Sequence, residues 1–204
     1  MNGATTDASG GLLENVQLAK DGAGPLLQRD YWAAIEESRL GPAQLMDDLR
    51  QRFCDFPSEL VSFEPVGSCD RPLQVGDELD IAIRMAGQCR VRVTATDAHS
   101  FTLATLQGHP EAGRITFGSY RHESGAVIFH IRGRARSGSV KFAAGFLAMG
   151  EAMQTNTWAD FVRTVAVTYG SGVIGEVHAE TTHVEPSDED ADPTRPTFAA
   201  LGVD

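Results

Sequence analysis

The sequence predicts an α+β domain in which a curved antiparallel sheet wraps around one long helix in the C-terminal half. Between Cys89 and Arg136, apolar and polar residues alternate in four successive runs, separated by short turn sequences, as in a series of β-strands. From Ser139 to Tyr169, apolar residues then recur at three- to five-residue steps, which indicates a helix with one apolar face. Because alternating strands bury one face of a sheet, this helix is the natural cover for that face.

The length and composition suit one globular domain that carries a tail at each end. The chain has 204 residues, of which 42% are hydrophobic and 22% charged. We expect a flexible N-terminal lead over residues 1–24, the folded domain over 25–184 and an acidic, disordered tail over 185–204. No apolar run approaches the roughly 20 residues that span a bilayer. The N-terminus also lacks the basic and apolar regions of a secretory signal, so we expect no membrane span and a cytoplasmic location.

The net charge of −11 is concentrated near the C-terminus, where residues 184–204 contain six acids and one arginine. An acidic surplus disfavours nonspecific binding to nucleic acid, so we expect no nucleic-acid partner. The three cysteines, Cys54, Cys69 and Cys89, are odd in number and form no Cys-x-x-Cys pair. This spacing predicts neither a disulfide framework nor a structural zinc site, and we expect no metal and no other cofactor.

The elements before the main sheet give weaker signals. Residues 28–38 begin like a strand around Tyr31 but alternate poorly. Residues 42–54 have an amphipathic helical pattern that starts with a proline, which is tolerated at a first helical position, and Pro57 ends it. A short strand is expected over residues 60–66.

The main sheet is expected to begin near residue 77. Residues 77–86 alternate cleanly, and Gly87-Gln88 is typical of a tight hairpin turn. Four further strands are expected over residues 89–96, 101–107, 114–121 and 127–136. Each strand should have one buried and one wet face, with His130 on the wet face.

The closing helix is expected to end at Gly170 and Gly172, because glycine commonly follows the last helical turn. Gly145 and Gly150 lower its intrinsic helicity by roughly 1 kcal/mol each relative to alanine, so packing against the sheet must outweigh that cost. Residues 173–184 fit either a last strand or an extended segment lying on the domain.

Two short motifs resemble functional signatures but lack the required context. Residues 170–175 read Gly-x-Gly-x-x-Gly, yet a dinucleotide site needs a strand before this motif and a helix after it. A helix precedes it here, so a helix-ending loop is the better interpretation. His178 and His183 are five residues apart, which points them to opposite faces of a strand and disfavours a shared metal.

His109 and Glu111 form the most suggestive polar pair, because they lie in a glycine-bounded loop at the end of the sheet, beside Arg114. Loops held by a rigid sheet often carry binding groups. The alternative is that both side chains cap the turn by hydrogen bonding to its backbone.

Outward positions of the predicted strands also carry several arginines: Arg90, Arg92, Arg132, Arg134 and Arg136. They would form a basic patch on the outer face of the sheet. No aromatic residues are interleaved with them, so a role in solubility is the better interpretation than nucleic-acid binding.

The segments CRVRVTATDAHSFTLATLQGHPEAGRITFGSYR and AVIFHIRGRARSG resemble a bacterial and plant family of domains of unknown function, number 1990. Its members share a Cys-Arg-Val strand and a Gly-Thr-Leu-x-Gly-His-Pro-Glu-x-Gly segment. The likeness is clearest over residues 75–150 and extends over 28–170. The chain departs from the pattern at Ala104, where the family has glycine, and by the extension over 171–204.

The order of elements also resembles the helix-grip fold of the START-like superfamily, which includes polyketide cyclases and the birch-pollen allergen. This resemblance implies a cavity for a hydrophobic ligand between the sheet and the long helix. It transfers no catalytic residue, because the family has no established activity to carry over.

We therefore hypothesise a protein that binds a small hydrophobic molecule and has little or no catalytic activity. Apolar residues should line the cavity from the sheet and the helix: Val91, Val93, Leu103, Phe117, Phe129, Ile131, Phe146, Met149, Met153 and Phe161. His109, Glu111 and Arg114 would gate its mouth.

Two alternatives stand beside that hypothesis. One is a cyclase- or hydrolase-like enzyme that uses His109 and Glu111 as acid and base. The other is a protein-interaction module that uses the arginine face or the acidic tail. The sequence leaves the oligomeric state open.

Overall fold

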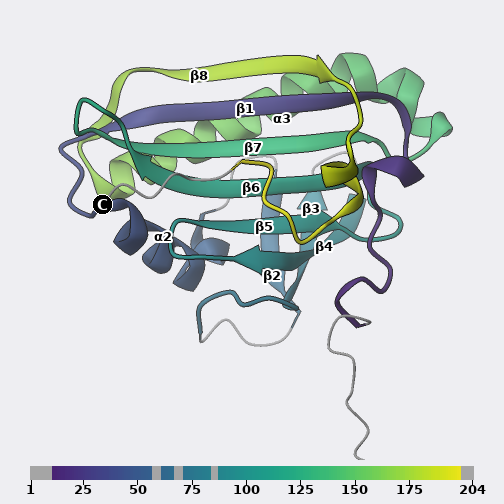
Figure 1. Ribbon diagram of the computed structural model, residues 1–204. Helices are drawn as coiled ribbons and strands as arrows, with labels where there is room; N and C mark the ends of the chain where they lie inside the picture. The colour runs from purple at the N-terminus through teal and green to yellow at the C-terminus, as the bar shows by residue number, and fades with distance from the viewer. Residues whose placement is uncertain (1–10, 57–60, 67–70, 84–86, 199–204) are drawn as a thin grey trace, which may run out of the picture.

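The computed structural model describes residues 11–56, 61–66, 71–83 and 87–198 (Figure 1); the side chains of residues 61, 83 and 140–154 lie outside that description. Eight strands form one antiparallel sheet in the order β2-β3-β4-β5-β6-β7-β1-β8. Their bounds are β1 Ala23–Glu36, β2 Val61–Pro65, β3 Glu78–Ile83, β4 Gly87–Thr96, β5 Ser100–Thr105, β6 Glu111–Arg121, β7 Val127–Ser137 and β8 Gly172–Val184.

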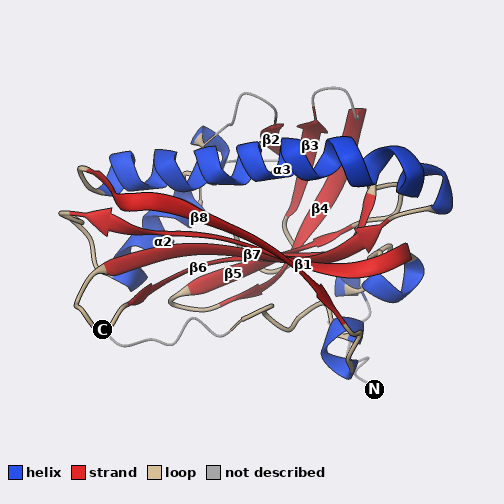
Figure 2. Cartoon of the chain, turned by 90° about the horizontal axis from the view of Figure 1, so that it is seen from above, coloured by secondary structure: helices blue, strands red, loops and turns tan. Residues whose placement is uncertain are grey.

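Helix α3, Val140–Tyr169, covers one face of this sheet, which we call the inner face. Figure 2 shows the helix lying lengthwise over the strands. Phe161, Val162 and Val165 are almost completely buried. The ring of Phe161 lies 5.6 Å from that of Phe117 on β6 and 6.2 Å from that of Phe129 on β7, measured between centroids. The predicted fold class, a curved antiparallel sheet around a long C-terminal helix, is confirmed as the helix-grip arrangement.

Helix α2, Pro42–Gln51, and the short 3₁₀ helix η2, Phe53–Asp55, complete the cover of the inner face. The apolar stripe of α2 is fully buried, and the ring of Phe53 lies edge-on to Phe101 and Phe117 at 5.2 Å from each. The sequence places the start of α2 correctly at Pro42 and its end three residues too late.

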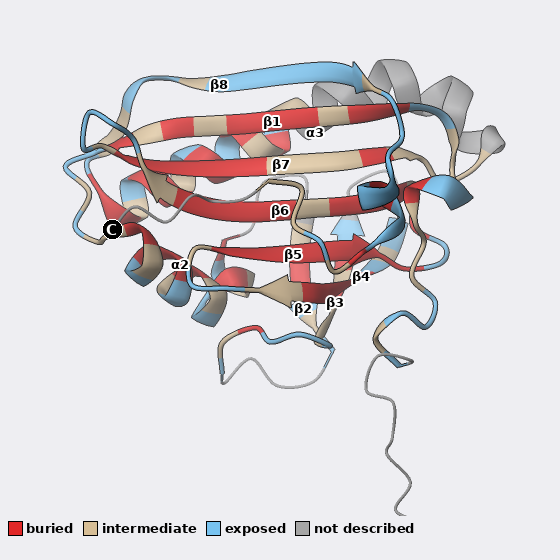
Figure 3. Ribbon diagram, viewed as in Figure 1, coloured by how far each residue is buried: buried red, intermediate tan, exposed pale blue. Residues whose placement is uncertain are grey.

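The first long strand, β1, lies between β7 and the last strand, β8. In the strand register, Tyr31 is paired with Ile131 of β7 on one side and with Ala179 of β8 on the other. Because its alternation is weak, the sequence predicts this strand too short: it starts at Ala23 rather than at residue 28. The ambiguous segment 173–184 is a strand, and as the sheet's edge it is mostly exposed (Figure 3).

One turn is also misplaced by the sequence. Gly87 is paired with Ile83 and belongs to β4, so Gly87-Gln88 is not the hairpin turn. The connection falls on residues 84–86, which lie outside the described residues.

The outer face of the sheet, on the side away from α3, is more buried than the sequence predicts. Thr94, Thr102, Thr116 and His130 point to this face and are nevertheless buried. Residues 187–198, which we call the C-terminal segment, lie across the sheet on the side away from α3 (Figures 1 and 2). This segment contacts three of the four side chains: Thr94 donates to Pro193 O, Thr116 accepts from the Thr197 N–H, and Phe198 stacks on His130. The expectation of a wet outer face is therefore wrong for the central strands.

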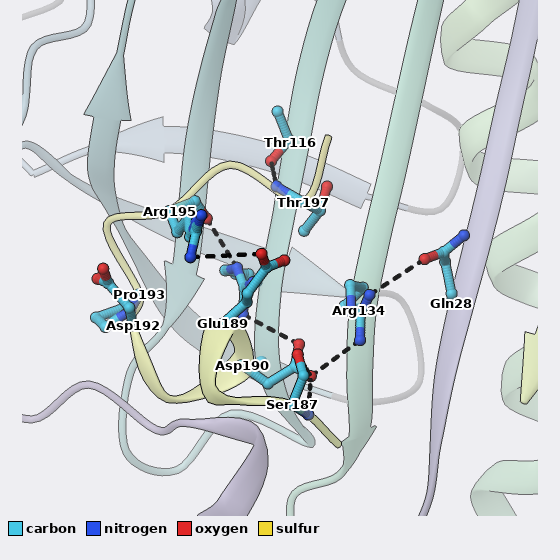
Figure 4. Close-up of polar contacts among 12 residues, drawn as sticks. Gln28, Thr116, Arg134, Ser187, Glu189, Asp190, Asp192, Pro193, Arg195 and Thr197 are labelled. Carbon is cyan, nitrogen blue, oxygen red and sulfur yellow. Dashed lines mark hydrogen bonds and ion pairs between the residues drawn. The ribbon is translucent and has the colours of Figure 1, made fainter. Parts of the chain in front are cut away.

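The C-terminal segment is attached to the outer face by Asp190, which belongs to the 3₁₀ helix η3, Asp188–Ala191 (Figure 4). Nη2 of Arg134 donates to the Asp190 carboxylate at 2.9 Å, and Nη1 of Arg114 does so at 3.4 Å. Burial raises the pKa of Asp190, but hydrogen bonds from the Ser187 backbone and from Arg134 outweigh it and hold the pKa below its ordinary value. The predicted disordered tail is thus wrong for the described residues, because outward arginines compensate its charge.

The described part of the N-terminal lead is also bonded to the sheet rather than free. The backbone N–H of Gln17 donates to Thr105 O at 2.7 Å, and its side-chain amide donates to Glu111 O at 2.8 Å. Nη1 of Arg92 donates to the carbonyls of Leu12 and Glu14. The division of the chain at residues 24/25 and 184/185 remains a prediction.

None of the described helices is both long and apolar enough to cross a bilayer.

Candidate functional site

A cavity of about 70 Å³ lies on the inner face, between the strands and α3. Most of its wall is apolar, and α3 contributes Trp158, whose ring is 6.3 Å from that of Phe63. Its lining residues are Arg29, Tyr31, Phe63, Ile81, Val91, Leu103, Thr105, His109, Glu111, Arg114, Ile115, Gly133, Ala135 and Trp158.

The polar part of the lining is built around an ion pair between Arg29 and Glu111. Nη1 of Arg29 lies 3.0 Å from Oε1 of Glu111, and the two side chains are 8% and 17% exposed. Every second residue of a strand points to the same face, so Arg29 shares the inner face with Tyr31 and Ala33 of β1. Tyr31 and Ala33 are buried in the core. Glu111 is the first residue of β6.

Arg29 is incompletely satisfied by its surroundings. Within the described part of the chain, its Nε is buried and has no hydrogen-bond partner. A buried donor without a partner costs about 1–3 kcal/mol. Arg29, which is one of the lining residues, therefore has an unpaired donor beside the ion pair.

His109 is held by the backbone next to this pair. Its Nδ1 accepts a hydrogen bond from the N–H of Glu111 at 3.0 Å, so Nδ1 carries no proton and the proton of the neutral ring is on Nε2. Burial lowers the pKa of His109, and the nearby charge of Glu111 opposes that shift without overcoming it. The imidazole is therefore uncharged at neutral pH.

These contacts separate the interpretations of the His109–Glu111 pair. The turn-capping interpretation describes His109, whose Nδ1 accepts the hydrogen bond from the backbone N–H of Glu111. It does not describe Glu111, whose carboxylate is paired with Arg29. With each side chain engaged in this way, the geometry does not favour the acid–base alternative. The interaction-module alternative is not favoured either, because the acidic segment and Arg134 are bonded to each other.

Five of the predicted site residues are brought together at the cavity: Val91, Leu103, His109, Glu111 and Arg114. The guanidinium of Arg114 does not gate this space, because it bonds to Asp190 and to the carbonyl of Arg195 on the outer face. Its predicted role as a gate is corrected accordingly.

The remaining predicted residues are not in the lining of this cavity. Some are fully buried in the core: Val93, Phe117, Phe129, Ile131 and Phe161. The side chains of Phe146, Met149 and Met153 lie outside the described set. Sequence reasoning missed Arg29. A usable signal was its charge at a position that shares one strand face with Tyr31 and Ile35.

A second polar cluster lies on the outer face. Nε2 of His130 is 2.6 Å from Oδ1 of Asp30, which also accepts a hydrogen bond from Arg132. Burial raises the pKa of Asp30, but these two hydrogen bonds outweigh it and the pKa lies below its ordinary value. The ring of Phe198 stacks on His130 at 4.5 Å, so the C-terminal segment covers this cluster.

Two other kinds of site are not found among the described residues. No group of three or more His, Cys, Asp or Glu side chains there is arranged to hold a metal ion. Burial raises the pKa of Cys89 to about 12, with smaller contributions from Glu111 and Asp80, so its thiol is protonated and a poor nucleophile at neutral pH.

Comparison with known families gives one match in sequence. The family model described as "Domain of unknown function (DUF1990)" matches residues 57–164, which is just over half of the chain. Among proteins with curated functions, none matches the sequence significantly.

Comparison with solved structures gives several similar folds at low identity. A conserved protein from Geobacillus kaustophilus is 12% identical, with a TM-score of 0.51 over 74% of this chain and 98% of that one. Norcoclaurine synthase from Thalictrum flavum is 11% identical, with a TM-score of 0.49 over 72% and 96%. Major latex-like protein 151 from Panax ginseng is 11% identical, with a TM-score of 0.47 over 72% and 99%. At these identities the likeness concerns the fold.

Proposed function

The chain belongs to the DUF1990 family of domains of unknown function, and from that premise we propose that it binds a small hydrophobic molecule in the cavity between the sheet and α3. The observation that carries this proposal is the lining, in which apolar side chains surround a space with a few polar groups. Binding sites for small molecules commonly have this composition. Val91, Leu103 and Trp158 supply apolar contacts, and Arg29 with Glu111 supplies the polar ones.

The size of the cavity limits the ligand. Pockets for drug-sized molecules measure ~300–1,000 Å³, whereas this space measures about 70 Å³. The cavity as it stands is smaller than the roughly 150 Å³ of an engineered apolar cavity that binds benzene, so a ligand with an aromatic ring requires its wall to move. Trp158, which is partly exposed and reaches the cavity from the helix, is the side chain best placed for such a movement.

Native mass spectrometry of the full chain purified from its own host tests the proposal. We expect a small molecule that is retained by the native protein and lost on denaturation. Ala135→Leu, which fills the cavity, should abolish the retention, whereas Ala98→Leu in an exposed turn should not. Equal retention by both variants would place the ligand elsewhere. A clean mass, together with no binding of acetophenone, ethylbenzene or benzoate, would contradict the proposal.

A further inference from the structure

The polar end of the cavity contains a charge that the fold does not require. Arg29 points to the inner face, where its strand neighbours Tyr31, Ala33 and Ile35 are all buried apolar or aromatic residues. An arginine is rarely buried unless it is paired. Replacing a buried ion pair by apolar residues of similar size is often neutral or stabilising, so such a pair is weak evidence for a role in stability.

The pairing with Glu111 leaves part of the guanidinium open. It uses Nη1 of Arg29, at a single contact of 3.0 Å. Nε is buried without a partner, and no described residue accepts a hydrogen bond from Nη2. Nε–H and Nη2–H lie along one edge of the planar group, and this edge can donate to one acceptor or to two adjacent ones.

The charges around this edge determine what kind of acceptor fits. Arg29 and Glu111 cancel each other, and His109 adds no charge because burial lowers its pKa. Arg114 is balanced by Asp190 on the other face of the sheet. A carboxylate in the cavity would be attracted by Arg29 and repelled by Glu111 to a similar extent. The cost of removing its charge from water would then remain uncompensated.

A neutral acceptor avoids that cost. We propose that the cavity selects a small, uncharged, mainly apolar molecule whose carbonyl oxygen accepts a hydrogen bond from the Nε–Nη2 edge of Arg29. This inference rests on the ligand-binding function proposed above and adds the chemical class of the ligand. Glu111 is then a positioning residue, which holds the guanidinium in place and neutralises it, while the apolar wall contacts the rest of the molecule.

Three probes of similar size and shape test the inference by ligand-observed NMR titration of the full chain: acetophenone, ethylbenzene and benzoate. Acetophenone carries the carbonyl, ethylbenzene lacks any acceptor, and benzoate is anionic. A hydrogen bond to a charged donor predicts that acetophenone binds about tenfold more tightly than ethylbenzene. Benzoate should bind more weakly than acetophenone.

The variant that isolates the polar recognition is the double replacement Arg29→Met/Glu111→Met. A single Arg29→Met would leave Glu111 buried without a partner and endanger the fold. The double variant should bind acetophenone and ethylbenzene equally, with ethylbenzene affinity preserved. The control is Arg90→Met/Asp80→Met, which removes an exposed ion pair of 2.8 Å on the outer face and should leave all three affinities unchanged.

The other outcomes separate the two proposals. Tightest binding by benzoate would overturn the neutral-ligand inference in favour of an anion. Equal binding of acetophenone and ethylbenzene by the unmodified protein would overturn polar recognition and leave the hydrophobic-ligand function standing. An acetophenone preference that survives in the Met/Met variant would show that Arg29 is not the donor. Binding of none of the probes would overturn the inference, and only together with a clean native mass would it also contradict the ligand-binding function.

Discussion

At the scale of single residues, Arg29 and Asp30 show how one strand serves two buried polar clusters. They are adjacent in β1, so their side chains point to opposite faces of the sheet. Arg29 pairs with Glu111 on the inner face, and Asp30 binds His130 and Arg132 on the outer face. Each charge is compensated by residues far away in sequence, so both clusters form only when the strands are in register.

The buried side chain of His109 makes the stability of the protein depend on pH. The folded protein holds His109 neutral because burial lowers its pKa below 6.5, whereas the unfolded chain protonates it near that value. Its contribution to stability is therefore present above about pH 6.5 and is lost as the pH falls through the folded pKa. We expect His109→Asn, whose side-chain oxygen can accept the same N–H of Glu111, to reduce the pH dependence of the unfolding free energy. The reduction between about pH 7 and 5 should not exceed about 1.4 kcal/mol per pH unit, the slope for one proton.

Denaturant unfolding at several pH values measures this slope, and His122 provides a matched control. Nδ1 of His122 also accepts a backbone N–H two residues later, from Ser124 at 3.2 Å, but this histidine is exposed. His122→Asn should leave the slope unchanged. A His109→Asn slope equal to that of the unmodified protein would contradict the assigned burial effect.

At the scale of residues, the sequence predicts some positions of the candidate site and misses others, and each outcome has a physical reason. Val91, Leu103, His109 and Glu111 line one cavity, as alternation and loop position predict because both are local properties, and their role in binding stays a prediction. Arg114 was misassigned because the residue that binds it, Asp190, is 76 positions away in an acidic tail. The Arg29–Glu111 contact spans 82 positions and has no local signature.

At the scale of secondary-structure elements, the end of α3 shows a correct prediction with a different cause. Gly170 does end the helix, but its φ of −148° is extended rather than left-handed. A glycine is needed there because β1 passes close by. A Cβ on residue 170 would fall inside van der Waals contact of the Glu36 carbonyl and the Ile35 side chain.

This close approach predicts that Gly170→Ala destabilises the protein. We expect a loss of about 2 kcal/mol, because the carbonyl is backbone and the helix or β1 has to shift. Gly11→Ala is the control, since a Cβ there would meet no atom within 4 Å. Thermal unfolding of both variants measures the difference, and equal melting temperatures would show that the junction accommodates a methyl group.

Elements were predicted best where one face is apolar and the other polar. The strands from β3 to β7 and helix α3 meet that condition. β1 does not, because Arg29 interrupts its apolar face and Trp32 and Ala34 lie on its other face, so its alternation is weak and the sequence places its start five residues late.

At the scale of the whole molecule, the C-terminal segment turns a two-layer fold into one with cover on both sides of the sheet. Besides the Asp190 contacts, further hydrogen bonds attach it: the hydroxyl of Thr197 donates to Arg132 O at 2.8 Å. Its backbone N–H donates to the Thr116 hydroxyl at 2.9 Å. Composition alone predicts disorder for such a segment, because composition does not reveal the arginines that receive it.

Deleting residues 185–204 should therefore destabilise the protein without unfolding it. We expect a loss of roughly 2 kcal/mol, because several hydrogen bonds of about 1 kcal/mol each are offset by the entropy regained by the segment. Arg114 then gains water in place of Asp190. Hydrogen exchange should quicken in the central strands β5 and β6, and the cavity should keep its affinity for acetophenone.

Deletion of residues 199–204 alone serves as the control and should change neither property. Global unfolding of the longer deletion would mean that the segment belongs to the folding core. Unchanged exchange in β5 and β6 would mean that it does not protect the outer face in solution.

The position of β1 has a consequence for synthesis on the ribosome. Its pairing partners are β7, residues 127–137, and β8, residues 172–184, so the first long strand to leave the ribosome is completed by the last. Until those residues emerge, the apolar side chains of Tyr31, Ala33 and Ile35 have no sheet to join. The nascent chain therefore carries β1 unpaired until its C-terminal half has emerged, and strands that are unpaired in this way are exposed to misfolding and aggregation.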